Sequence, residues 1–232
     1  MTERAGKNGL LWLIIAAIIT VILWRVPGGG YILYPFTILA TWFHEMGHGL
    51  TALMLGGEFR SLTLYPDGSG VATHSGNLAF GNLGRALVAA GGPMGPAVSG
   101  AVFIITGRYP QGSRYCLILL GGVLIASAFI WIDSQFGLIF TLLLGITILA
   151  ASQTSPWLRS FAIQFLGVQA IISSYRQIDY LFTHSAVIGG NQMLSDTAHI
   201  GEALFMPYWF WGGAITLISL LLLVISLRIA YR

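Results

Sequence analysis

Two histidines and a glutamate, His44, Glu45 and His48, stand within five residues of one another in an otherwise apolar stretch. On an α-helix, residues i and i+4 lie on the same face, one turn apart. Both imidazoles can therefore reach a single Zn²⁺ at about 2.0–2.1 Å. Glu45 directly follows the first histidine, where it can take a proton from a water molecule that such a metal activates. The pattern predicts a hydrolytic metal site.

The competing interpretation is that these residues only pack inside the protein. A single core histidine is more often a hydrogen-bonded packing residue than a metal ligand. The whole chain, however, has only five histidines and eight acidic residues. Burying an unpaired glutamate among apolar side chains costs several kcal/mol. The grouping of two histidines with Glu45 therefore favours a metal site.

Two imidazoles leave a catalytic zinc site incomplete, because such sites usually have three protein ligands and one open position. The single cysteine, Cys116, lies in an apolar run, so neither a disulfide nor a cysteine-based site is expected. The remaining candidates for the third ligand are Asp67, Asp133, Asp179, Asp196, Glu202, His184 and His199.

Composition indicates that the bilayer is the solvent for most of the surface. Hydrophobic residues make up 56% of the 232 residues and charged residues only 8%, whereas a soluble domain has about 25% charged residues. The net charge of +3 comes from scattered basic residues, which gives no sign of nucleic-acid binding. We expect one integral membrane domain over residues 1–232.

Seven apolar stretches have the length of membrane spans, which need about 20 residues. They predict an all-α polytopic membrane protein with about six to seven transmembrane helices. Lysine and arginine are divided too evenly between the two sides to set the orientation. The stretches are 9–24, 31–55, 86–106, 115–132, 136–151, 161–182 and 208–229.

Two segments interrupt this apolar pattern. Residues 58–84 predict a membrane-associated β-hairpin, because segments 60–65 and 70–74 have strand character and flank the turn sequence Pro-Asp-Gly-Ser. Residues 184–206 predict a re-entrant or surface loop with a short helix from 197 to 204. Such a loop can bring Asp196 back to the metal, although a plain N-cap role for Ser195 or Asp196 also fits the sequence.

Five segments together resemble the site-2 protease-like metalloproteases, and most closely the small branch without a PDZ domain. These segments are 44–52, 56–57, 66–70, 167–173 and 195–198. The resemblance implies an intramembrane zinc peptidase that cleaves peptide bonds in or near membrane helices of substrate proteins. It implies His44 and His48 as ligands and Glu45 as the general base.

The family's third ligand is an aspartate late in the chain, but its usual sequence context is missing here. Gln177 stands where the small branch tends to carry an aspartate, and Asp179 follows two residues later. We favour Asp196 as the third ligand, then Asp179, then Asp133. An ion pair between Arg176 and Asp179 is the alternative for the second candidate.

A second motif, Gly91 to Pro96, is similar to a Gly-Pro segment in the third core helix of the larger family, without the asparagine that usually follows. The preferred interpretation is a small-residue packing face.

The overall resemblance implies a location in a bacterial inner membrane. Two other functions stay open: an inactive relative that binds membrane helices as a chaperone, and a metal transporter. Transport is disfavoured because the ionisable residues gather at one depth in the membrane and do not form a path across the spans.

Overall fold

The computed structural model describes residues 2–176 and 178–232, which form helices and two short hairpins. The elements in chain order are α1 (Thr2–Leu23), α2 (Gly29–Met54), β1 (Glu58–Leu64), β2 (Gly70–Ser75), α3 (Asn82–Thr106), α4 (Pro110–Ile130), α5 (Gln135–Ala151), α6 (Pro156–Arg176), α7 (Ile178–Leu181), β3 (Ser185–Ile188), β4 (Asn191–Leu194), α8 (Asp196–Leu204) and α9 (Tyr208–Tyr231).

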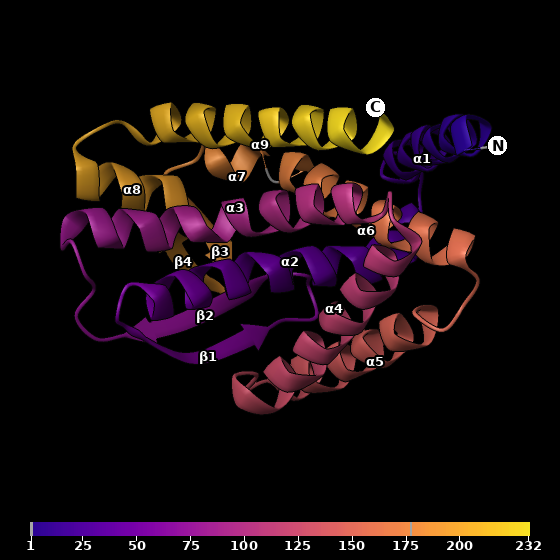
Figure 1. Ribbon diagram of the computed structural model, residues 1–232. Coiled ribbons are helices and arrows are strands. Elements are labelled where there is room, and N and C mark those ends of the chain that lie inside the picture. Colours follow the sequence, from indigo (N-terminus) through magenta and orange to yellow (C-terminus); the bar gives the residue numbers. More distant parts are fainter. Residues whose placement is uncertain (1, 177) are drawn as a thin grey trace.

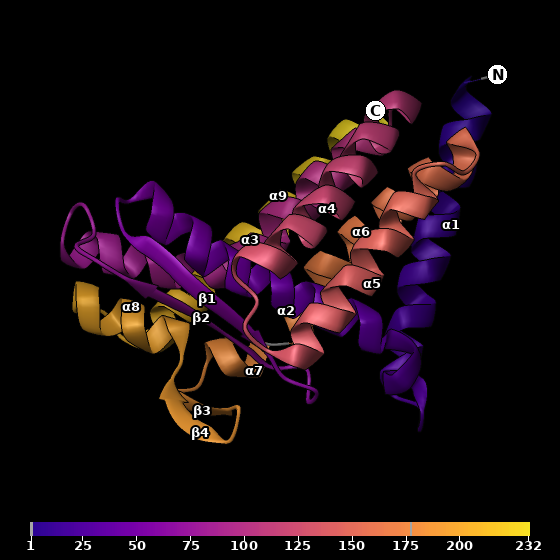
Figure 2. The same cartoon turned by 90° about the horizontal axis from the view of Figure 1, so that it is seen from below.

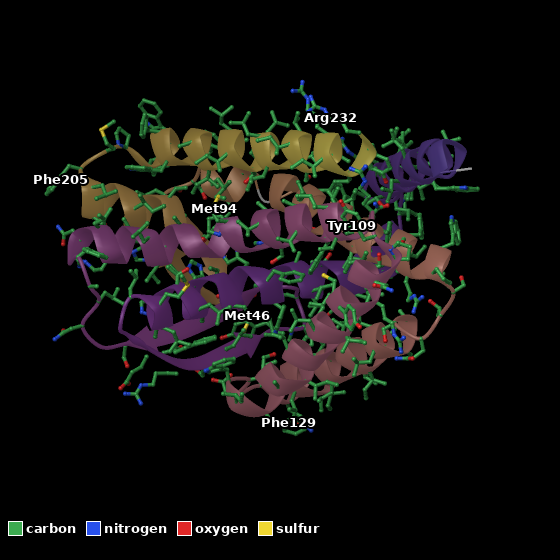
Figure 3. The ribbon with its side chains drawn as sticks, viewed as in Figure 1. Met46, Met94, Tyr109, Phe129, Phe205 and Arg232 are labelled. Carbon is green, nitrogen blue, oxygen red and sulfur yellow. The ribbon has the colours of Figure 1, made fainter. Side chains whose placement is uncertain are left out.

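The helices are those expected of a membrane protein, but the expected number of spans is not confirmed. Within the described residues, three helices are long and apolar enough to cross a bilayer, namely α3, α4 and α9. Shorter apolar helices cover residues 10–23 and α5. Large apolar side chains such as Phe129 and Phe205 project outward, 73% and 89% exposed (Figure 3). The expected stretch 161–182 is divided into α6 and α7, with residue 177 outside the described residues.

Helices α9, α3 and α2 lie one above another, with the first hairpin beneath α2 (Figure 1). The contact between α2 and α3 is made by glycines. A Cβ on Gly47 would collide with the carbonyl oxygen of Gly91, and a Cβ on Gly95 would collide with that of Phe43. The Gly-Pro segment is therefore a close-packing face, as predicted.

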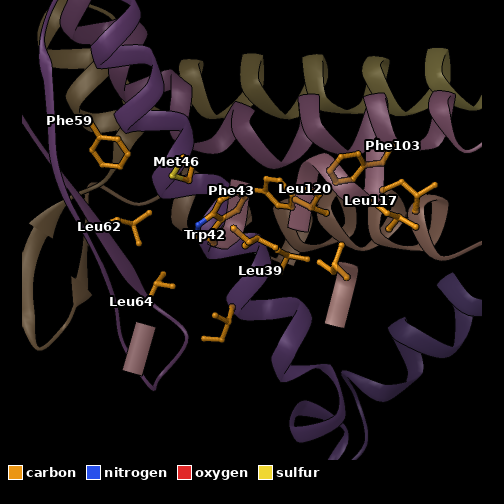
Figure 4. Close-up of a cluster of buried hydrophobic side chains, with 14 residues drawn as sticks. Leu39, Trp42, Phe43, Met46, Phe59, Leu62, Leu64, Phe103, Leu117 and Leu120 are labelled. Carbon is orange, nitrogen blue, oxygen red and sulfur yellow. The ribbon is translucent and has the colours of Figure 1, made fainter. Parts of the chain in front are cut away.

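The first hairpin, β1–β2, confirms the strand prediction and is fixed to the helices. Its register pairs Leu62 with Ala72, and a bulge follows Phe59. The buried side chains of Phe59, Leu62 and Leu64 join the cluster that contains Trp42 of α2 (Figure 4). Burying these apolar side chains presses the hairpin against the helix.

The two edges of this small sheet differ. On the outer edge of β1, the Leu62 N–H donates to the Trp131 carbonyl at 2.8 Å, and the Asp133 N–H donates to the Leu62 carbonyl at 3.3 Å. The segment between α4 and α5 therefore covers that edge. Among the described strands, β2 pairs only with β1, which leaves its far edge open.

The second hairpin, β3–β4, was not predicted. Its four-residue strands are joined by Gly189 and Gly190, both with positive φ, and it projects from the helical body (Figure 2). The region 184–206 was expected as a re-entrant or surface loop. The structure instead places an antiparallel hairpin there, followed by the expected short helix, α8.

Candidate metal centre

Helix α2 presents His44, Glu45 and His48 toward the interior. His44 and Glu45 are buried, and the two imidazole centroids lie 4.9 Å apart. Nδ1 of His48 lies 2.8 Å from the carbonyl oxygen of Val88. Because a carbonyl can only accept a hydrogen bond, Nδ1 carries the proton and Nε2 keeps its lone pair. The ring is thereby fixed in the tautomer that a metal ligand needs.

Asp196, the first residue of α8, reaches both imidazoles. Its Oδ2 lies 3.0 Å from Nε2 of His44, and its Oδ1 lies 3.3 Å from Nε2 of His48. One ligand atom from each of the three residues can be chosen so that all lie within 4.8 Å of one another. The structure therefore brings together the three residues that the sequence favoured. Their role as metal ligands stays a prediction.

The arrangement fits a zinc ion. Oδ2 of Asp196 is fully buried and has no hydrogen-bond partner, although Nε2 of His44 is close enough in distance alone. A buried carboxylate oxygen without a hydrogen bond is costly, and a cation between the three groups would satisfy it. Two imidazoles and one carboxylate are also a donor set of catalytic zinc sites.

Gly92 of α3 lies directly against the two imidazole rings. A Cβ at this position would collide with Nε2 and Cε1 of His48 and would lie 2.8 Å from Nε2 of His44. A glycine is therefore required for the α3 backbone to pass so close to the ligand nitrogens. The sequence interpretation recognised the packing face but missed this second role of Gly92.

Glu45 lies between the histidines and strand β2. A Cβ on Gly70 would lie 2.9 Å from Cγ of Glu45, so the strand backbone passes directly beside this side chain. Leu62 of β1 faces Ala72, and both backbone groups of Leu62 bond to residues 131 and 133 on the other side of β1. In such a non-hydrogen-bonded pair the Ala72 N–H points away from β1 and toward the open edge of the sheet.

These residues line a cavity of about 960 Å³. His44, Glu45, His48 and Asp196 all contribute to its wall. The first hairpin contributes β2 to one side, and the second contributes apolar residues such as Val187 and Ile188. The exposed polar residues in the lining include His74, Arg85, His199 and Glu202. The cavity is therefore bordered by both hairpins and by all four candidate site residues.

The other candidates for the third ligand do not join His44 and His48, although Asp67, His199 and Glu202 line the same cavity. Asp67 accepts hydrogen bonds from the backbone and hydroxyl of Ser69 in the hairpin turn. Asp133 accepts one from Thr63, and Asp179 is exposed. None of them joins the group of three potential ligands found among the described residues.

Two other interpretations are resolved differently. Ser195, not Asp196, caps α8, because its hydroxyl accepts from the N–H of Ala198. The proposed pair of Arg176 with Asp179 involves a side chain outside the described residues.

Tyr180, which also lines the cavity, was missed by the sequence interpretation. Its one sequence signal is its position next to Asp179 in a segment that was interpreted as membrane span.

The comparison with known families agrees with this geometry. A model of the family described as Peptidase M50B-like matches residues 12–226. Because the match covers most of the chain, the protein belongs to this family, which is the site-2 protease family. The resemblance noted from the motifs is confirmed. No curated protein and no solved structure matches the chain significantly.

Proposed function

We propose that this protein is an intramembrane zinc metalloendopeptidase that hydrolyses peptide bonds in or near the membrane helices of other proteins. The main support is the convergence of His44, His48 and Asp196 beside Glu45 in the wall of one cavity. Family membership adds the reaction class, because M50 peptidases are zinc metallopeptidases. The resemblance to the small branch supports a bacterial inner membrane as its location.

In this proposal His44, His48 and Asp196 hold the zinc ion. When bound, zinc would polarise the scissile carbonyl group and lower the pKa of water toward ~7. Glu45 takes the proton of the attacking water and later delivers it to the leaving amine. Its position beside the β2 backbone keeps its carboxylate turned toward the cavity.

The open edge of β2 supports an extended substrate. A peptide that adds to this edge would use main-chain hydrogen bonds, so its recognition would depend little on side chains. The Ala72 N–H lies on this edge beside Glu45, which would bring a paired peptide bond close to the general base. A substrate helix would therefore have to unwind locally before cleavage.

Zinc content and cleavage test the proposal together. Detergent-purified wild type, Glu45→Gln and Asp179→Ala should each carry about one zinc per chain, whereas His44→Ala and Asp196→Ala should carry none. With a transmembrane substrate in proteoliposomes, Glu45→Gln should cleave about 10²- to 10⁴-fold more slowly than wild type. Asp179→Ala, the matched carboxylate control, should cleave at the wild-type rate.

The two readouts separate the alternatives. A folded wild type that takes up no zinc, even when zinc is supplied, would exclude a metallopeptidase. Zinc binding without cleavage of any transmembrane substrate would instead support an inactive relative that binds membrane helices. Equal zinc retention by Asp196→Ala and wild type would remove Asp196 as the third ligand.

A further inference from the structure

Asp196 is held from both sides by hydrogen bonds to a preceding segment of the chain. The Ser195 hydroxyl donates to the Thr183 carbonyl oxygen at 2.6 Å. The Thr197 hydroxyl donates to the Leu181 carbonyl oxygen at 2.9 Å. The neighbours of Asp196 therefore use their side chains to fix the backbone, and the Asp196 side chain is left to face the histidines.

Tyr180 adds a contact to Asp196 itself. Its hydroxyl accepts a hydrogen bond from the backbone N–H of Asp196 at 3.2 Å. This N–H is at the first turn of α8, where backbone N–H groups have no partner within the helix. The Tyr180 hydroxyl therefore restrains the backbone of Asp196, from which the side chain extends toward the histidines.

The same tyrosine also contacts a second residue of the site. Its ring packs edge-on against the His44 imidazole, with centroids 6.3 Å apart and an interplanar angle of 69°. One side chain thus touches two of the three proposed ligands, one from α2 and one from α8. These two ligands come from helices separated by about 150 positions in the chain, so a shared neighbour can align them.

We propose that Tyr180 is a positioning residue that orients Asp196 and His44 for metal binding. This inference rests on the proposed function, because it concerns the same metal site. Partners that orient metal ligands control metal affinity as well as geometry, and their loss typically weakens binding about 10- to 100-fold. A tyrosine that served only to pack α7 would change stability without changing the metal site.

The test compares Tyr180→Phe with wild type and with Tyr208→Phe. The first change removes only the hydroxyl that contacts Asp196. Tyr208 is a matched control, because it packs edge-on against His184, 5.9 Å between centroids, and is not in the wall of the cavity. Competition with a chromophoric chelator measures zinc affinity. The visible spectrum of the cobalt-substituted protein reports the ligand geometry, and thermal unfolding of the metal-free protein reports folding.

We expect Tyr180→Phe to bind zinc about 10- to 100-fold more weakly and to shift the cobalt bands, with little change in metal-free unfolding. Tyr208→Phe should match wild type in affinity and spectrum. Unchanged affinity and spectrum in Tyr180→Phe would overturn the proposal. So would a Tyr180→Phe protein that is unfolded without metal, because the hydroxyl would then be structural. If wild type and Tyr208→Phe bind no zinc either, the proposed function itself fails.

Discussion

The two hairpins that border the cavity are attached in different ways. Hairpin β1–β2 buries three apolar side chains, and two hydroxyls of α2 fix its turn: Tyr34 donates to Pro66 and Thr41 to Gly68, both at 2.6 Å. Hairpin β3–β4 has shorter strands, and Val187 at its centre is 71% exposed. At its base, the Ser195 N–H donates to the His184 carbonyl oxygen. At its tip, Gly189 lies against the Tyr65 ring.

The cavity therefore has one firmly attached wall, β1–β2, and one weakly held wall, β3–β4. The fixed wall carries the open strand edge beside Glu45, where the proposed substrate would be aligned. The weakly held wall presents apolar side chains to the opposite side. Elements with few buried contacts open locally at low free-energy cost, so substrate entry should depend more on β3–β4 than on β1–β2.

The largest expected contrast is in stability. Leu62→Ala removes a fully buried side chain between β1 and α2 and should lower the free energy of unfolding by about 2–5 kcal/mol. Val187→Ala, the matched truncation in β3, should change it by less than about 0.5 kcal/mol. Unfolding in mixed detergent micelles measures both. Similar losses for the two variants would show that β3–β4 is packed as firmly as β1–β2.

Hydrogen exchange sharpens the same comparison without mutation. Amides in residues 58–75 should exchange at least about tenfold more slowly than those in 185–194, because local opening of the second hairpin disrupts less packing. Peptide-level mass spectrometry in detergent resolves both segments, with α8 as an internal reference. Equal protection of the two hairpins would contradict the distinction.

A smaller effect is expected from the hydroxyl that fixes the first turn. Thr41→Val keeps the side-chain shape but removes the bond to the Gly68 carbonyl oxygen, which should cost about 1 kcal/mol. Thr147→Val is the control, since the Thr147 hydroxyl bonds to a carbonyl of its own helix. The difference between the two variants in the same unfolding assay measures the attachment of the hairpin. No difference would mean that Thr41 does not fix the turn.

The smallest effect concerns pH. Hydrogen bonds from Ser69 lower the pKa of Asp67 below its ordinary value of 3.8. Because the folded pKa is the lower one, the charged carboxylate stabilises the turn above the unfolded pKa, and this stabilisation disappears as the pH falls through the folded value. Wild type should therefore exceed Asp67→Asn in stability at pH 7 and approach it near pH 3. A stability difference between wild type and Asp67→Asn that grows as the pH falls would contradict the lowered pKa of Asp67.

The sequence predicted what depends on local pattern. His44, Glu45 and His48 are placed on one face by helical spacing alone, and the Pro-Asp-Gly-Ser turn between two strand-like segments predicted β1–β2. The second hairpin carries a weaker signal, Gly189-Gly190 directly after the short β-prone segment 186–188. It was missed because the segment was interpreted as a loop leading to a helix.

Long-range contacts were harder to predict. The choice of Asp196 came from the position of its loop and from the family resemblance, and the competing N-cap interpretation applied to its neighbour Ser195. Tyr180 could not be recognised, because its contact with Asp196 depends on how the chain folds back between α7 and the start of α8. The number of membrane spans stays a prediction: among the described residues, three helices are long and apolar enough to cross a bilayer, and two shorter helices are also apolar.

Gly92 has a consequence for reading related sequences. The HExxH motif is the usual sign of activity, yet the α3 backbone must also leave room at the two imidazole nitrogens. In a relative that keeps the motif, any larger side chain at the position of Gly92 would press against both imidazoles and displace the rings from their present positions. That one position would then separate relatives that can bind the proposed metal ion from those that cannot, and a Gly92→Ala protein that still binds zinc would show that it does not.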